Sequence, residues 1–404
     1  MGRKRWSGRV VQAILLLCGI GILAGHVRKS GENTQEKTRQ QLVLWSYYET
    51  EAQQKALDEL TEGFYVYSEE YEIRWEYVPM TEFSKRLSIG YTENALPDLV
   101  IMDNPDMPYY INTGLLADIS ILEEELEIKQ MCYPVLLDTV YDRGRLYGLP
   151  WNCNNTALIY HTDMLREAGV EPPSDWEEFA AAVDALKGDG RYGFLMSAVA
   201  GEQGAFQILP WILSTGEEVG QIGAGGTVRA YDFLYGLIES GGMDANCINY
   251  SQIDVARKFI SGEAAMMENG PWVLPMLEKA GLDYGIVSLP MDVRRCSVVG
   301  GENIGILRGK NTEGATEFLR YCARDEVMKA FCDATGVLPA KKALGDGRDE
   351  RMDVFAGQME SAVLRTENEH WNTLRDQLPQ GLYEMMAEGM TAQEAAARLV
   401  SDNK

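Results

Sequence analysis

The sequence predicts an α/β protein built from two lobes. The chain has 404 residues, which is more than one ordinary hydrophobic core serves, so two lobes are expected. Short apolar segments with strand character alternate with amphipathic helical segments along the chain. This alternation is typical of parallel sheets with helices on their faces. The 46% of hydrophobic residues suffices to pack such cores, which argues against wholesale disorder.

The first lobe is expected to begin with two strands, Leu42–Ser46 and Tyr71–Val78, separated by a helix. Thr50 and Gln53 have the spacing of a capping box, which marks the start of that helix. A third strand, Leu99–Met102, is apolar throughout, and this pattern indicates that it is buried.

The segment Arg145–Leu165 suits a crossover between the lobes, because a strand broken at Pro150 is followed by a long β-like run. Ser174 and Glu177 then form a second predicted capping box before a helix, and the strand Tyr192–Met196 follows.

The segment Phe259–Trp272, FISGEAAMMENGPW, contains a helix end, the strand Ala264–Met267 and a new helix that starts at Pro271. Trp272 therefore falls just past the carboxyl end of a strand, where open α/β sheets bind their ligands. An indole there is a platform for the apolar face of a sugar. The same position equally suits a core anchor.

The strand Tyr284–Pro290 is expected to lead back to the first lobe, and the C-terminal part is expected to be helical. A third capping box, Thr391 to Glu394, marks the start of the last helix. The segment Gly188–Gly193, GDGRYG, matches G-x-G-x-x-G, but it follows a helix and precedes a strand. We therefore predict a loop there and no dinucleotide site.

The net charge of −24 excludes nucleic acid as a main partner, since nucleic-acid binding needs a basic surface. Six cations precede the first acid, Glu32, and flank the apolar run Val10–Val27. This pattern predicts a signal peptide or an N-terminal membrane anchor over residues 1–31, followed by a linker over 32–40. In either case the rest of the protein faces the outside of the cell.

No metal site or cofactor is expected. The three histidines lack metal-ligand spacing, and we interpret His161 and His370 as surface or packing residues. The six cysteines after Cys18 form no C-x-x-C pair and have irregular spacings. Because a chain of this size does not need disulfide bonds for stability, we favour mostly free cysteines.

Eight strings in this chain resemble, in the same order, those of bacterial extracellular solute-binding proteins of family 1. These are the carbohydrate-binding subunits of ABC importers and include maltose-binding protein. The strings are LVLWS-YYE, LPDLVIMD, TGLLADI, LYGLPWNCNNTALIY, FISGEAAMMENGPW, YGIVSLP, GGENIGIL and TGVLPAKKA. The resemblance implies the periplasmic-binding-protein type II fold, with two α/β lobes joined by hinge crossings and a ligand cleft between them. The implied lobes are 41–150 plus 296–345, and 151–295 plus 346–404.

A sugar site needs aromatic platforms together with fixed carboxylates and amides. On this basis and on the resemblance, the predicted ligand-binding residues are Tyr48, Glu49, Asp103, Trp151, Asn154, Trp211, Trp272, Asn303 and Trp371. Asn154 falls where maltose-binding proteins have a carboxylate, which leaves a maltose-like ligand in doubt. Each of the other tryptophans also suits a core position, and Asp103 also suits a turn. The Gly300–Gly301 loop before Asn303 suits either a close backbone approach or an ordinary turn.

The resemblance implies a monomeric binding protein, not an enzyme, that captures a carbohydrate at the outer face of the cytoplasmic membrane. Its partners would be the permease subunits of an ABC importer, with membrane contact through the N-terminal segment or the permease. Two alternatives stay open: a secreted glycosidase, for which no local motif is present, and a membrane-anchored sugar sensor.

Overall fold

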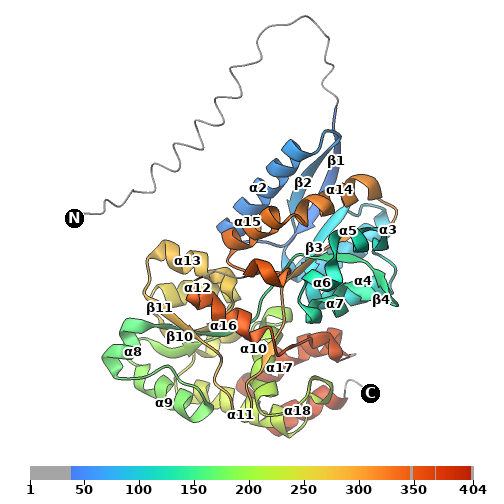
Figure 1. Ribbon diagram of the computed structural model, residues 1–404. Coiled ribbons are helices and arrows are strands. Elements are labelled where there is room, and N and C mark those ends of the chain that lie inside the picture. The colour runs from blue at the N-terminus through green and yellow to red at the C-terminus, as the bar shows by residue number, and fades with distance from the viewer. Residues whose placement is uncertain (1–37, 346–348, 369, 402–404) are drawn as a thin grey trace, which may run out of the picture. The chain divides into compact units, whose positions relative to one another are not determined.

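Two β-sheets organise the computed structural model of this protein, which describes residues 38–345, 349–368 and 370–401 (Figure 1). Gln40–Lys404 forms one compact unit, so the predicted lobe boundaries stay a prediction. The expected signal peptide or anchor lies outside the described residues, as does most of the linker. Within the described ranges, no helix has the length and apolarity that a membrane span requires.

The first sheet has five strands in the order β2-β1-β3-β13-β6. The strands β1, β2 and β3 run parallel, and β13 is antiparallel to both β3 and β6. All residues of β3 and β13 are buried, which confirms the buried third strand. The bounds are β1 Gln40–Ser46, β2 Tyr71–Tyr77, β3 Leu99–Asp103, β6 Gly148–Pro150 and β13 Glu302–Ile306.

Helices cover both faces of this sheet. The predicted capping box of Thr50 and Gln53 is present at the start of α2 (Glu51–Tyr67). The ring of Phe64 packs against Phe318 and Tyr321, which joins α2 to α14. Because β2 and β3 lie on opposite sides of β1, right-handed connections place α2 and α3 on opposite faces. The remaining elements of this region are α3 Met80–Glu93, η1 Asn104–Asp106, α4 Met107–Asn112, η2 Ser120–Leu122, α5 Glu123–Leu126, α6 Ile128–Met131, α7 Pro134–Val140, β4 Tyr141–Asp142, β5 Arg145–Leu146, α14 Thr312–Cys322 and α15 Asp325–Thr335.

The chain crosses from the first sheet to the second between Pro150 and Ala157, as the sequence predicts. β6 ends at Pro150, and β7 (Asn152–Cys153) then pairs with β14 (Leu338–Pro339) outside both sheets. β8 (Ala157–His161) begins the second sheet. The chain returns through β12 (Ser297–Val298) to β13.

The second sheet has the order β11-β8-β10-β9, with the bounds β9 Tyr192–Leu195, β10 Ala264–Asn269 and β11 Tyr284–Val287. β10 runs two residues beyond the predicted strand, and Pro271 opens a 3₁₀ turn, η5 (Pro271–Val273), before the α-helix starts. The other elements are α8 Thr162–Ala168, α9 Trp176–Leu186, α10 Glu202–Ser214, η3 Val219–Gln221, α11 Gly225–Glu239, η4 Ala245–Asn249, α12 Gln252–Ile260, α13 Leu274–Ala280, η6 Lys342–Gly345, α16 Glu350–Gln358, β15 Ala362–Val363, η7 Arg365–Glu367, α17 Trp371–Glu388 and α18 Ala392–Ser401.

The predicted capping box of Ser174 and Glu177 is wrong by one residue. Asp175 caps α9, because its extended backbone lets its carboxylate accept from the backbone N–H of Glu178 at 2.9 Å. Ser174 donates to the Glu178 carboxylate instead. The third predicted box, Thr391 with Glu394, is present.

The remaining sequence predictions concern loops, thiols and the surface. Gly188 and Gly190 have positive φ in the turn between α9 and β9, which confirms a loop over residues 188–191, while Tyr192 and Gly193 already belong to β9. Cys132, Cys247, Cys296 and Cys322 are free thiols.

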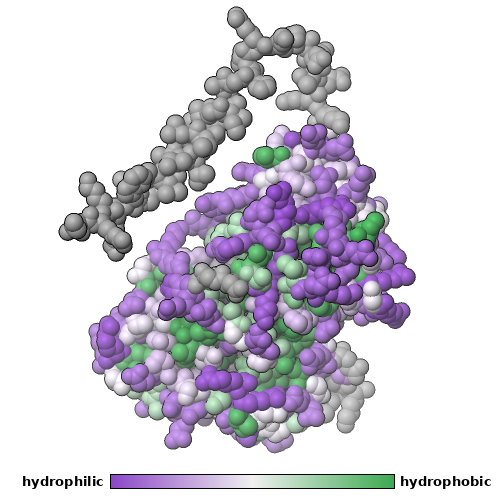
Figure 2. Space-filling view, viewed as in Figure 1, coloured by the Kyte–Doolittle hydropathy of each residue, from purple (hydrophilic) through white to green (hydrophobic). Residues whose placement is uncertain are grey.

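His161 is buried and stacks on Phe259, with its Nε2 2.8 Å from the Phe259 carbonyl oxygen. Hydrophilic residues cover most of the face in Figure 2, as the acidic composition predicts.

Candidate functional site

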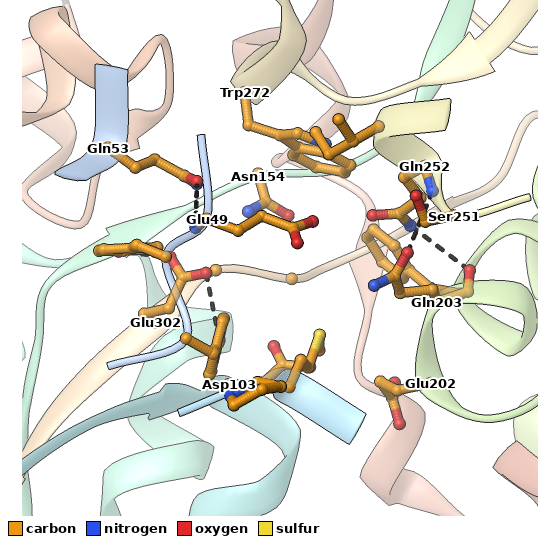
Figure 3. Close-up of a pocket in the computed structure, with 18 of the residues that line it drawn as sticks. Glu49, Gln53, Asp103, Asn154, Glu202, Gln203, Ser251, Gln252, Trp272 and Glu302 are labelled. Atoms are coloured by element: carbon orange, nitrogen blue, oxygen red, sulfur yellow. Dashed lines mark hydrogen bonds between the residues drawn. The ribbon is translucent and has the colours of Figure 1, made fainter. Parts of the chain in front are cut away.

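A cavity of about 260 Å³ is lined on one side by strand ends of the first sheet and on the other by segments that connect the strands of the second sheet (Figure 3). Its walls come from the ends of β1 and β3, the start of β13, the crossover segment, and the starts of α10, α12 and η5. The volume is close to the lower end of the range of about 300–1,000 Å³ that is typical of small-molecule sites.

The Glu302 carboxylate forms part of the wall on the side of the first sheet. Tyr47 and Tyr48, which follow β1, donate their hydroxyls to its two oxygens at 3.2 and 3.0 Å. Asn152 in the crossover donates to the Tyr48 hydroxyl at 2.9 Å. Burial raises the pKa of Glu302, while these hydrogen bonds oppose the rise. The network holds the carboxylate in one orientation at the cavity.

A buried arginine forms the floor of the cavity. Arg365 in η7 is only 1% exposed. Its guanidinium donates to both oxygens of Asp103 at 3.2 and 3.0 Å, and its Nε lies 3.2 Å from Oε1 of Glu202. The ring of Phe206 lies 4.4 Å from the guanidinium carbon. Because a buried charge is costly without a partner, this cluster links the end of β3 to the start of α10.

Trp272 forms the opposite wall, and Gly270 permits its position. A methyl group on Gly270 would lie 1.8 Å from the indole, so the ring covers the glycine backbone closely. Trp272 is 9% exposed and lies 6.3 Å from Phe206, ring centre to ring centre. The N-G-P-W string therefore has a packing reason: the glycine lets the indole fold back over the strand end.

The crossover and the Gly300–Gly301 loop meet at the back of the cavity. Asn154 and Gly300 exchange two backbone hydrogen bonds, at 3.0 and 2.8 Å. A methyl group on Gly301, whose φ is +111°, would lie 2.5 Å from the Cα of Cys153. Between the two alternatives for this loop, the structure therefore favours a close backbone approach.

The side chain of Glu49 extends into the cavity below the indole of Trp272 (Figure 3). Its backbone N–H donates to Gln53 Oε1 at 3.2 Å. Across the described ranges, no hydrogen bond or ion pair reaches its carboxylate. Burial raises its pKa. Amide and hydroxyl groups of Gln203, Ser251 and Gln252 face it across the cavity (Figure 3).

Five of the nine predicted residues come together around this cavity, and four do not. The five are Tyr48, Glu49, Asp103, Asn154 and Trp272. Asn303 is buried beneath the sheet and donates to Thr139 at 3.0 Å. Its neighbour Glu302 faces the cavity instead, because successive strand residues point to opposite faces.

The three other predicted tryptophans lie outside the cavity and have structural partners. Trp151 packs on Phe331, with ring centres 5.0 Å apart. Trp211 donates at 2.7 Å to Glu268, which lies in β10 of the second sheet. Trp371 donates to Glu202 Oε2 at 3.2 Å, so it contacts the charged cluster from behind.

The sequence did not point to four residues that supply much of the charge and aromatic surface of the cavity: Glu202, Phe206, Glu302 and Arg365. Glu302 had a local signal, because it lies in the GGEN string beside the predicted Asn303. Arg365 had none, because it comes from a C-terminal segment that is far from the strand ends in sequence.

Residues 46–353 match the model of a family described as bacterial extracellular solute-binding protein. The galactooligosaccharide-binding protein of Bacillus subtilis is 22% identical, over 97% of this chain and 92% of that protein. The sn-glycerol-3-phosphate-binding periplasmic protein UgpB of Shigella dysenteriae is 25% identical, over 50% of this chain and 51% of that protein. The structure of maltose-bound T. maritima MalE3 superposes with a TM-score of 0.82 at 19% identity, over 90% of this chain and 98% of that chain. This likeness confirms the predicted fold class.

Proposed function

Because the chain belongs to the bacterial extracellular solute-binding proteins, we propose that it captures a carbohydrate outside the cell and delivers it to the permease of an ABC importer. The relatives support a sugar as the solute, since one is named for galactooligosaccharides and a structural neighbour holds maltose.

One observation carries the proposal: an indole wall faces carboxylate and amide groups within a single cavity (Figure 3). A sugar ring presents C–H groups on its faces and hydroxyls at its edge. The indole of Trp272 suits the face, and Glu49, Asn154 and Gln203 suit the hydroxyls, since amides both donate and accept.

The charge of the cavity argues against a phosphate ester, which is the ligand in the name of UgpB. Among the described residues that line the cavity, four are acidic and one is basic, Arg365, which gives a formal excess of three negative charges. Arg365 already donates hydrogen bonds to both oxygens of Asp103. A phosphate dianion would therefore meet repulsion, and the proposed ligand carries no negative charge.

Capture requires no bond cleavage. We propose that ligand contacts to both walls favour a closed arrangement of the two lobes, which the permease then recognises. The matched family consists of binding proteins, and the proposal extends this to an absence of catalysis, against the alternative of a glycosidase. The proposal also places the protein, as a monomer, at the outer face of the cytoplasmic membrane. The alternative to this transport role is a membrane-anchored sensor.

Calorimetry of the purified protein against a glycan panel tests the proposal, with mass spectrometry of the recovered ligands. The expected result is saturable, stoichiometric binding of at least one sugar, recovered intact. Binding of phosphate esters in preference to sugars, or release of cleaved fragments, would contradict it. Pull-down from membranes of the source cell separates transport from sensing: recovery of ABC permease subunits supports transport, and recovery of a histidine kinase supports sensing.

A further inference from the structure

We infer that the preferred ligand bears a positively charged amino group, held between the Glu49 carboxylate and the face of the Trp272 indole. The inference rests on the proposed function and specifies the class of sugar, namely one with a free amine. The carboxylates of the cavity differ in the hydrogen-bond and ion-pair partners that they already have.

Three of the four cavity carboxylates have partners. Asp103 accepts two hydrogen bonds from Arg365. Glu302 accepts from Tyr47 and Tyr48. The third, Glu202, lies beside the Arg365 guanidinium and accepts from Trp371. Glu49 is thus the carboxylate whose two oxygens are available to a ligand.

Nearby cations do not neutralise Glu49. The positive charge that acts on it most is that of Arg257, whose guanidinium donates to Asp254 at 3.0 Å. Arg365 is occupied by Asp103 at the floor of the cavity. A sugar hydroxyl would satisfy the hydrogen-bonding capacity of Glu49 but would leave its charge without a counter-charge. An ammonium group would supply both the hydrogen bond and the opposite charge.

The indole adds an attraction that a neutral hydroxyl lacks. The Glu49 carboxylate and the ring of Trp272 both face the cavity (Figure 3). A cation bound between them would be attracted by the carboxylate and by the negative π-face of the indole. The ring also packs directly against the Gly270 backbone, where no side chain could be accommodated. The two groups therefore define one position for an amine.

Matched sugars test this inference directly. Glucosamine, galactosamine, mannosamine and chitobiose are each compared with the counterpart that has a hydroxyl in place of the amine, and with the N-acetylated counterpart. Calorimetry on the full-length protein, below the pKa of the sugar amine, gives the dissociation constants. We expect at least one free amine to bind about tenfold more tightly than both of its neutral counterparts, a ratio that corresponds to about 1.4 kcal/mol.

Two glutamate variants locate the effect. Glu49→Gln keeps the shape and removes the charge, so it should abolish most of the preference for the amine. Glu59→Gln is the matched control, because it makes the same change in net charge at an exposed position of α2, where Glu59 lies beside Lys55. It should leave the preference unchanged.

Each remaining outcome is decisive. If neutral forms bind as tightly as amines in every set, the inference falls and the proposed function stands. If the preference persists in Glu49→Gln, the assignment to Glu49 is overturned. If no member of these sets binds but another sugar of the glycan panel does, the inference falls and the proposed function stands; if no sugar of the panel binds either, both are contradicted.

Discussion

Replacing Glu268 with Gln should remove a large pH dependence of stability. Glu268 lies in β10 and is fully buried. Its Oε2 accepts from Trp211 at 2.7 Å, and its Oε1 lies 2.8 Å from the Thr156 hydroxyl. Burial raises the pKa of Glu268 from 4.5 to about 8, and the two hydrogen bonds oppose the rise only in part. The carboxyl is therefore mostly protonated at neutral pH in the folded protein.

The size of the effect follows from that difference in pKa. The folded state binds the proton more tightly than the unfolded state, so this contribution is fully present below pH 4.5. It is lost as the pH rises from 4.5 to about 8. Each pKa unit is worth about 1.4 kcal/mol, so the full loss is of the order of 5 kcal/mol. Gln reproduces the protonated acid, because its oxygen can accept from Trp211 while its NH₂ donates to the Thr156 hydroxyl.

Urea unfolding of the wild type and Glu268→Gln between pH 5.5 and 7.5 measures this effect. The free energy of unfolding of the wild type should fall, relative to the variant, by about 1.4 kcal/mol per pH unit. Subtracting the free energy of unfolding of the variant from that of the wild type cancels the contributions of the other titrating groups. Parallel pH dependences would refute the reasoning, since they would mean that Glu268 is charged in the folded protein.

Three further substitutions test the site. Trp272→Ala should weaken ligand binding by about 1–3 kcal/mol through lost stacking and burial, with the circular dichroism spectrum retained; an unchanged affinity would remove the indole from the site. Gly270→Ala should weaken binding and lower the melting temperature, because its methyl group would lie 1.8 Å from the indole, and wild-type values for both would show that the indole moves freely. Arg365→Ala should destabilise the protein by about 3–5 kcal/mol in denaturant unfolding, since it leaves Asp103 without its ion-pair partner and Glu202 with only Arg375, at 3.9 Å. A loss below about 1 kcal/mol would indicate that the two carboxyls are protonated in the folded protein.

Most of the fold could be predicted from local sequence patterns. The apolar run of β3, the capping boxes at Thr50 and Thr391, and the break at Pro150 each depend on residues within one turn or one strand. The error at Ser174 is also local, because adjacent Ser and Asp compete for one cap and the backbone conformation decides between them.

The site was readable only in part. Trp272 and Asn154 follow from strings at strand ends and the crossover. Asn303 illustrates what failed: the string was right, but a shift of one residue on a strand exchanges the two faces, so Glu302 reaches the cavity. A single sequence does not reveal which face of β13 is covered by helices.

The sequence by itself determined the alternation of strands and helices, the crossover and the family resemblance, because these depend on short-range periodicity and turn chemistry. Only the tertiary structure decided which charges meet. Arg365 reaches Asp103 across 262 positions of sequence, and Glu302 reaches Tyr48 across 254. Such contacts depend on how separate elements pack, and burial then selects partners that no local pattern encodes. Within the part of the chain that the structure describes, the same packing leaves the Glu49 carboxylate without a partner, and our proposal for the ligand depends on this.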